Sequence, residues 1–167
     1  KSEIEAFVGG ALSLRWPPKA LREWAAETTL DGAGRSTGCA VILADGERMA
    51  RFAAAGWWGT RTLDDLFRAA VAAHPDREAL VDPPDRGVRF GGRPRRLDWR
   101  TLGAEVARMA GLLRDEGCKR DDVVVVQLAN TVEQAIVVLA LLRLGCIVSP
   151  VAEPLGDAEL RRLLGAS

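Results

Sequence analysis

Residues 121–150 constrain the fold of this chain more than any other stretch. Residues 123–128 are a nearly continuous apolar run, which is typical of a strand covered on both faces in a parallel sheet. Asn130-Thr131 then begin a predicted helix that ends at Gly145, and residues 146–149 have the pattern of a second strand. Strand, helix and strand in this order predict a right-handed parallel crossover. We therefore expect an α/β fold with a mostly parallel sheet flanked by helices.

The residues before this unit predict further elements that end in clear stop signals. A helix beginning at Thr62 has Asp65 three residues later, which is the pattern of a capping box. His74-Pro75 end that helix, because the residue before proline is disfavoured in helical geometry. The other expected elements include strands over 39–43, 78–82 and 95–98 and helices over 47–55 and 157–164. A further helix is expected from Asp98, with a left-handed Gly117 at its end and a buried stripe of Leu102, Val106, Met109, Ala110 and Leu113.

The composition is that of a globular protein with balanced charge. Of 167 residues, 48% are apolar and 28% are charged, with 23 basic and 23 acidic side chains, so neither disorder nor bulk attraction to nucleic acid or anionic membranes is indicated. No stretch is long enough and apolar enough for a membrane span. Cys39, Cys118 and Cys146 are far apart in the sequence, which favours reduced thiols over a disulfide framework or a zinc site and predicts a cytoplasmic location.

From Gly56 onward the chain resembles the N-terminal subdomain of the adenylate-forming superfamily, which includes acyl- and aryl-CoA ligases, aryl-AMP ligases and adenylation domains. The matching segments keep the family's order over about two-thirds of the chain. They are residues 55–58, 62–67, 74–80, 97–102, 121–130 (for "Gly-Asp-x-Val-x-x-x-Leu-Pro-Asn"), 142–151 (for "Leu-x-x-Gly-Ala-x-x-x-Pro-x") and 155–164. Ala129 replaces the usual proline, and Gly156-Asp157 replace Thr-Pro.

The resemblance implies a domain organisation and a reaction. Residues 1–55 would be an N-terminal extension of unclear fold, and residues 56–167 the truncated start of the ligase's N-terminal domain. The complete enzyme would use ATP and Mg²⁺ to adenylate a carbocyclic, aryl or fatty acid and would pass the acyl group to the thiol of CoA or of a carrier protein. The partners implied are the remainder of the ligase chain, the carboxylic acid and that thiol.

The family's catalytic parts are missing from the matching region. Its phosphate loop is a Ser/Thr/Gly-rich stretch that ends in lysine, because a triphosphate needs several N–H donors and a cation at once. Ser36-Thr37-Gly38 lie before the match and no lysine follows them directly. We therefore expect no catalytic, cofactor-binding or metal-binding residue in this chain, and no activity from it alone.

Several residues invite a functional interpretation and also have a structural one. An arginine stretch, defined as Arg86, Arg89, Arg93, Arg95, Arg96 and Arg100, could touch RNA, CoA phosphates or an acidic carrier protein, but a solvated hairpin face is favoured. His74 is interpreted as a turn residue. Asp64-Asp65 are attributed to the positive end of a helix dipole, and Trp57-Trp58 to packing. Residues 1–38 weakly resemble the family's C-terminal lid, but an ordinary extension is favoured.

Three hypotheses follow. The first is a fragment of an AMP-forming acid–thiol ligase that lacks the ATP site. The second is a free-standing, non-catalytic binding or assembly module built on the same scaffold. The third, and weakest, is nucleic-acid binding through the arginine stretch.

Overall fold

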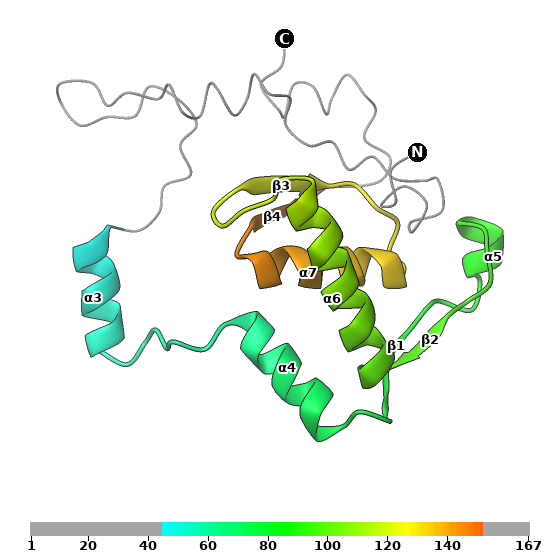
Figure 1. Ribbon diagram of the computed structural model, residues 1–167, viewed down its shortest axis with the longest axis horizontal. Coiled ribbons are helices and arrows are strands. Elements are labelled where there is room, and N and C mark those ends of the chain that lie inside the picture. Colours follow the sequence, from blue (N-terminus) through cyan, green and yellow to red (C-terminus); the bar gives the residue numbers. More distant parts are fainter. Residues whose placement is uncertain (1–44, 152–167) are drawn as a thin grey trace, which may run out of the picture. The chain divides into compact units, whose positions relative to one another are not determined.

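The computed structural model describes residues 45–151 (Figure 1). These residues belong to two compact units, one containing residues 45–61 and the other residues 62–151. In chain order the elements are α3 (Gly46–Ala54), α4 (Leu63–Ala73), β1 (Glu78–Val81), α5 (Arg86–Arg89), β2 (Arg96–Asp98), α6 (Trp99–Asp115), β3 (Val123–Val126), α7 (Val132–Leu144) and β4 (Ile147–Pro150). The expected strand at 39–43 and the expected helix at 157–164 lie outside the described residues.

Two short strand pairs make up the described sheet structure. β3 and β4 pair in parallel, from Val123 opposite Ile147 to Val126 opposite Pro150, and α7 is the crossover between them. This confirms the predicted strand–helix–strand unit. β1 and β2 form a separate antiparallel hairpin with an irregular register. The parallel pairing in the described part of the chain is therefore limited to one of these two pairs.

The core lies where α6 and α7 pack against each other (Figure 1). All five residues of the stripe predicted for α6 are buried, and Val106 and Met109 have no exposed surface. α7 is apolar on nearly every side and buries Ile136, Val137 and Leu141, as expected for a helix with neighbours around it. Val124 and Val126 of β3 complete the same core.

Both long helices end in the same motif. Gly117 has a φ of 97° and Gly145 a φ of 77°, the left-handed region that glycine adopts without steric cost. The N–H of Cys118 donates to the carbonyl of Leu113, and the N–H of Cys146 donates to that of Leu141, each at 3.0 Å. These are Schellman ends, so the predicted stops at Gly117 and Gly145 are confirmed.

The start of α4 is also as predicted, but its apolar face is only partly covered. The Thr62 hydroxyl accepts from the Asp65 N–H at 3.1 Å, and the Asp65 carboxylate accepts from the Thr62 N–H at 2.9 Å. Phe67 is buried, whereas Leu63 and Leu66 are 60% and 47% exposed. The apolar side chains of α4 therefore extend beyond the surface that α6 and α7 cover in the described residues.

In the unit of residues 45–61, Asp45 caps α3, and its carboxylate accepts from the N–H of Arg48 at 2.6 Å. The Phe52 ring lies 5.5 Å and 5.0 Å from the rings of Trp57 and Trp58, centroid to centroid. Both tryptophans contact Phe52 of the same unit and remain 75% and 45% exposed. The predicted packing of this pair against the rest of the chain stays a prediction.

Val106→Ala tests the position of the core against a matched control, Val88→Ala. Val106 is fully buried in α6, and Val88 is 92% exposed in α5, so one chemical change is made in two environments. We expect the Val106 change to lower the free energy of unfolding by about 2 kcal/mol, because apolar contacts are lost and a cavity remains. The Val88 change should leave it almost unaltered. Urea unfolding measures both, and equal effects would place the core elsewhere.

Candidate functional site

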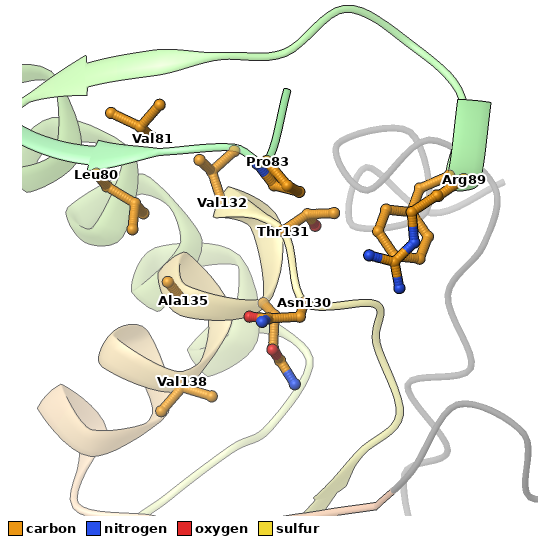
Figure 2. A pocket seen from close by; sticks show the side chains of 11 residues that line it. Leu80, Val81, Pro83, Arg89, Asn130, Thr131, Val132, Ala135 and Val138 are labelled. Carbon is orange, nitrogen blue, oxygen red and sulfur yellow. The ribbon is translucent and has the colours of Figure 1, made fainter. Parts of the chain in front are cut away.

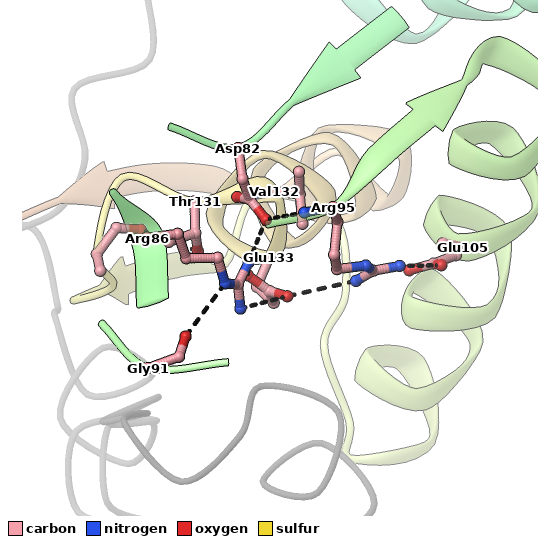
Figure 3. Close-up of polar contacts among 9 residues, drawn as sticks. Asp82, Arg86, Gly91, Arg95, Glu105, Thr131, Val132 and Glu133 are labelled. Carbon is pink, nitrogen blue, oxygen red and sulfur yellow. Dashed lines mark hydrogen bonds and ion pairs between the residues drawn. The ribbon is translucent and has the colours of Figure 1, made fainter. Parts of the chain in front are cut away.

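A cluster of ion-paired side chains lies at the amino end of α7 (Figure 3). We call Asp82, Arg86, Arg95, Glu105 and Glu133 the ionic cluster. Asp82 directly follows β1, and Arg95 directly precedes β2. Arg86 lies in α5, Glu105 in α6 and Glu133 in the first turn of α7. Asp82 and Glu133 are buried, with only 3% and 5% of their surfaces exposed. Charges at this depth are costly unless they are paired and hydrogen-bonded.

Asp82 accepts hydrogen bonds from three directions. Its Oδ1 accepts from the backbone N–H of Val132 at 2.9 Å, and its Oδ2 accepts from the backbone N–H of Arg95 at 2.9 Å. The guanidinium of Arg86 donates to the same Oδ2. Thr131 was expected to cap α7, but its side chain makes no cap hydrogen bond. A carboxylate 50 residues earlier in the chain supplies that cap instead.

Arg86 joins the two buried carboxylates. Besides Asp82, it donates from Nη1 to Glu133 Oε2 at 2.9 Å and from Nη2 to Glu133 Oε1 at 3.1 Å. This two-point contact suits the planar guanidinium, which holds a carboxylate through two parallel N–H bonds. Figure 3 shows Arg86 between Asp82 and Glu133, with the carbonyl of Gly91 close to its Nε.

Arg95 extends the cluster to α6. Its Nη1 donates to Glu133 Oε1 at 3.3 Å, and its Nη2 donates to Glu105 Oε1. The second carboxylate oxygen of Glu105 is buried without a hydrogen-bond partner. The cluster therefore joins the hairpin to α6 and α7.

The cluster favours the charged forms of Asp82, Glu133 and Arg86. Burial alone would raise the pKa of Asp82, but the hydrogen bonds from Val132, Arg95 and Arg86 outweigh it and hold this pKa below its ordinary value. Glu133 behaves in the same way: burial opposes ionisation, and hydrogen bonds, first from Arg86, lower the pKa overall. The contact with Glu133 raises the pKa of Arg86.

A hollow of about 500 Å³ lies beside the cluster (Figure 2). Leu80 and Val81 line it from β1, Pro83 from the residues after that strand, and Val132, Ala135 and Val138 from α7. Arg89, Asn130, Thr131 and Gln134 are the polar groups at its rim. The residues that line the hollow include no cysteine, histidine, aspartate or glutamate.

These residues do not fit ATP or Mg²⁺. The amino end of a helix binds phosphate through free N–H groups, but in α7 the Val132 N–H is taken by Asp82, and Glu133 adds a second negative charge in the first turn. The cluster's carboxylates are paired with arginines rather than left open to a metal. Among the described residues there is no group of three or more His, Cys, Asp or Glu that could hold a metal ion. The arrangement is suited to holding the β1–β2 hairpin against α6 and α7.

The arginine stretch is not a uniform solvated face. Arg86 and Arg95 belong to the ionic cluster, with side chains only 13% and 30% exposed, which corrects the expectation for these two residues. The more exposed members Arg89, Arg96 and Arg100 pair with Asp85, Glu78 and Asp76. Nearby carboxylates thus offset most of the positive charge that an RNA contact would use.

The other singled-out residues have structural positions. His74 ends α4, and its N–H donates to the carbonyl of Ala70 at 2.9 Å, as predicted. Asp65 closes the capping box. Asp64 does more than face the helix dipole, because it accepts from Arg143 Nε at 2.9 Å and so joins α4 to the end of α7. Ser36-Thr37-Gly38 lie outside the described residues, as does the weak lid resemblance over residues 1–38.

Sequence reasoning missed the cluster itself. Asp82 was expected only as the end of a strand, and a first-turn glutamate such as Glu133 is ordinarily explained by the helix dipole. The one available signal in the sequence was the arginine stretch, which lies between the strand that ends at Asp82 and the helix that contains Glu105. It does not say which of these arginines turn inward, because that depends on how the hairpin packs on α7.

Within the described residues no helix is both long and apolar enough to cross a membrane.

Replacing Asp82 with asparagine tests whether this carboxylate holds the hairpin on α7. The change removes a buried charge that accepts from Val132, Arg95 and Arg86, so we expect a loss of about 3 kcal/mol in the free energy of unfolding. Asp85→Asn is the matched control, because Asp85 is an exposed partner of Arg89 and its loss should change stability little. Similar effects of the two changes in urea unfolding would contradict a central role for Asp82.

The lowered pKa values of Asp82 and Glu133 predict acid sensitivity. A carboxyl whose pKa is depressed in the folded state contributes stability above its unfolded-state pKa and loses it as pH falls through the folded-state value. Starting from the ordinary values of 3.8 and 4.5, the free energy of unfolding should begin to fall as pH drops below about 5 and should continue to fall below those ordinary values. The slope should be smaller in Glu133→Gln. An unchanged slope in that variant would assign the acid sensitivity to other groups.

Comparison with known proteins gives a consistent result. Residues 67–167 match the family described as AMP-binding enzyme. The salicyl-AMP ligase / salicyl-S-ArCP synthetase of Mycobacterium tuberculosis is 37% identical over 101 residues, which is 60% of this chain and 17% of that protein. The 2-hydroxy-7-methoxy-5-methyl-1-naphthoate–CoA ligase of Streptomyces carzinostaticus is 40% identical over 98 residues, 59% of this chain and 16% of the ligase. The chain thus spans less than a fifth of these relatives' lengths.

A solved structure agrees on the fold. The N-terminal subdomain of Klebsiella oxytoca NpsA, in complex with anthranilyl-AMSN, aligns over 64% of this chain and 25% of that one with a TM-score of 0.54. At 23% identity this likeness is evidence for the fold alone. With the family match over residues 67–167, it leads to one conclusion: the chain belongs to the AMP-binding enzyme family and has the fold of part of the N-terminal subdomain of adenylate-forming enzymes.

Proposed function

We propose that residues 56–167 form the first part of the N-terminal domain of an enzyme that adenylates an aryl carboxylic acid and transfers it to a thiol. The observation that carries this proposal is the family match over residues 67–167, together with two relatives whose names specify salicylate and a naphthoate. A third relative is the acetyl-coenzyme A synthetase of Shewanella baltica, 32% identical over 81 residues. The names thus favour an aryl acid over a fatty acid.

The reaction proposed for the complete enzyme has two stages. A carboxylate is a poor electrophile, so ATP first converts it to an acyl adenylate with release of pyrophosphate, and a thiol of CoA or of a carrier protein then displaces AMP. Neither the ionic cluster nor the adjoining hollow is suited to bind ATP or Mg²⁺, so we assign no step of this chemistry to the described residues. A cytoplasmic location and the boundary between residues 55 and 56 stay predictions.

The described part supplies rigidity. Asp82 and Arg86 hold the β1–β2 hairpin against the first turn of α7, and Arg143 holds α4 against the last turn of α7. Charged contacts of this kind require a fixed geometry, because each buried group is satisfied only when all its partners are in place. In the proposed enzyme this unit supports the strands and loops that hold the substrates.

The first test is ATP–pyrophosphate exchange by the purified 167-residue chain with salicylate and other aryl acids. We expect no exchange above that of a heat-denatured sample. Exchange that depends on an added acid would overturn the assignment of a purely supporting role.

A segment exchange tests whether the fragment can serve as such a support. Residues 67–167 would replace the matching segment of the Mycobacterium tuberculosis salicyl-AMP ligase, and we expect the hybrid to retain salicylate-dependent exchange at a reduced rate. The matched control is the same hybrid with Asp82→Asn, and we expect it to have a lower free energy of unfolding than the unmodified hybrid. A soluble, cooperatively folded hybrid without exchange would favour the non-catalytic module instead.

A further inference from the structure

Cys118 and Cys146 are brought together although 28 positions separate them in the sequence. Each follows the left-handed glycine that ends a long helix, Gly117 for α6 and Gly145 for α7. Both thiols are free and buried, with 3% and 5% of the residue surfaces exposed. The two turns in which they lie precede the parallel strands β3 and β4.

Backbone hydrogen bonds hold these two turns side by side. The N–H of Asp121 donates to the carbonyl of Gly145 at 3.0 Å, and the N–H of Ile147 donates to the carbonyl of Asp122 at 2.8 Å. The Cys146 thiol donates to the carbonyl of Lys119, the residue after Cys118, with an Sγ–O distance of 3.3 Å. The sulfur of Cys146 is therefore next to the peptide that follows Cys118.

The thiols also influence each other directly. Burial first, and then the charge of a Cys146 thiolate, raise the pKa of Cys118 to about 12. Burial likewise raises the pKa of Cys146, whereas a hydrogen bond with the Cys118 side chain lowers it. Asp121, Asp122 and Glu116 are the nearby charged groups, and all three disfavour a thiolate.

We propose that Cys118 and Cys146 form a modification site at which a small hydroperoxide converts the two buried thiols into an intramolecular disulfide. The thiolate of one cysteine attacks the peroxide oxygen, which gives a sulfenic acid and, from hydrogen peroxide, hydroxide. The second thiol then displaces the hydroxyl group from that sulfur, the S–S bond forms, and water leaves. Two thiols are oxidised, one peroxide is reduced, and a thiol reductant reverses the change.

The disulfide would link the α6–β3 turn to the α7–β4 turn. It closes a loop that contains β3 and all of α7, so it restricts the unfolded chain more than the folded one. In the pattern that residues 142–151 resemble, alanine stands at the position of Cys146, so the pair is a feature of this chain rather than of that pattern. The consequence is a scaffold whose stability depends on its oxidation state.

The test uses the full chain with Cys39→Ala, which leaves only the two proposed cysteines. After treatment with hydrogen peroxide under native conditions, we expect intact mass to show the loss of two hydrogen atoms and peptide mapping to find Cys118 joined to Cys146. The midpoint temperature of unfolding should rise by roughly 5 to 15 °C and return on reduction. Because both thiols are protonated near neutral pH, the oxidation rate should increase by up to about tenfold per pH unit.

Cys146→Ala in the same background is the matched control, since alanine fits the family pattern at this position. It should form no disulfide-linked dimer, lack the cross-linked peptide and show no rise in midpoint temperature. A second variant, Cys118→Ala, guards against a folding defect in the first. Thiols that remain unmodified in the folded protein, or a disulfide that lowers the midpoint temperature, would overturn the proposal.

Discussion

The contact on which the described structure depends is the one between the Asp82 carboxylate and the first N–H of α7. It places a negative charge at the positive end of a helix and satisfies a buried donor at the same time. Because Asp82 also accepts from the Arg95 backbone and from Arg86, the same carboxylate fixes the hairpin that follows it. Removal of this carboxylate would leave the Arg86 guanidinium and the backbone N–H groups of Arg95 and Val132 without one of their buried acceptors.

The ionic cluster and the apolar core divide the task of specifying the fold. The α6–α7 core supplies most of the apolar burial, but apolar burial is non-directional, whereas a guanidinium and a carboxylate pair in a fixed geometry. Arg86, Arg95 and their carboxylate partners are stable in one arrangement. If a guanidinium moved away, it would leave the charge of a buried carboxylate unpaired. The ionic cluster therefore fixes the position of the β1–β2 hairpin relative to the apolar core, which consists of other residues.

The same geometry limits what this part of the family's fold does chemically. A helix end with its donors satisfied internally does not attract phosphate, and carboxylates held by arginines do not bind a metal. We therefore interpret the described residues as support for a site formed by other residues. The proposed redox pair would act on that support, because it joins the turns from which the two parallel strands begin.

Local sequence determined where most elements begin and end. The Thr62–Asp65 box, Gly117, Gly145 and the apolar run at residues 123–128 act within a few residues of themselves, so they were readable without the fold. The motifs from Gly56 onward likewise indicated the family, and the family match covers residues 67–167. Only tertiary structure decided that Asp82 rather than Thr131 caps α7, that Arg86 and Arg95 turn inward, and that Cys118 meets Cys146. The contacts of Asp82 with Val132, of Arg86 and Arg95 with Glu133, and of Cys118 with Cys146 join residues 28 to 50 positions apart. Their energies depend on packing that no local pattern encodes.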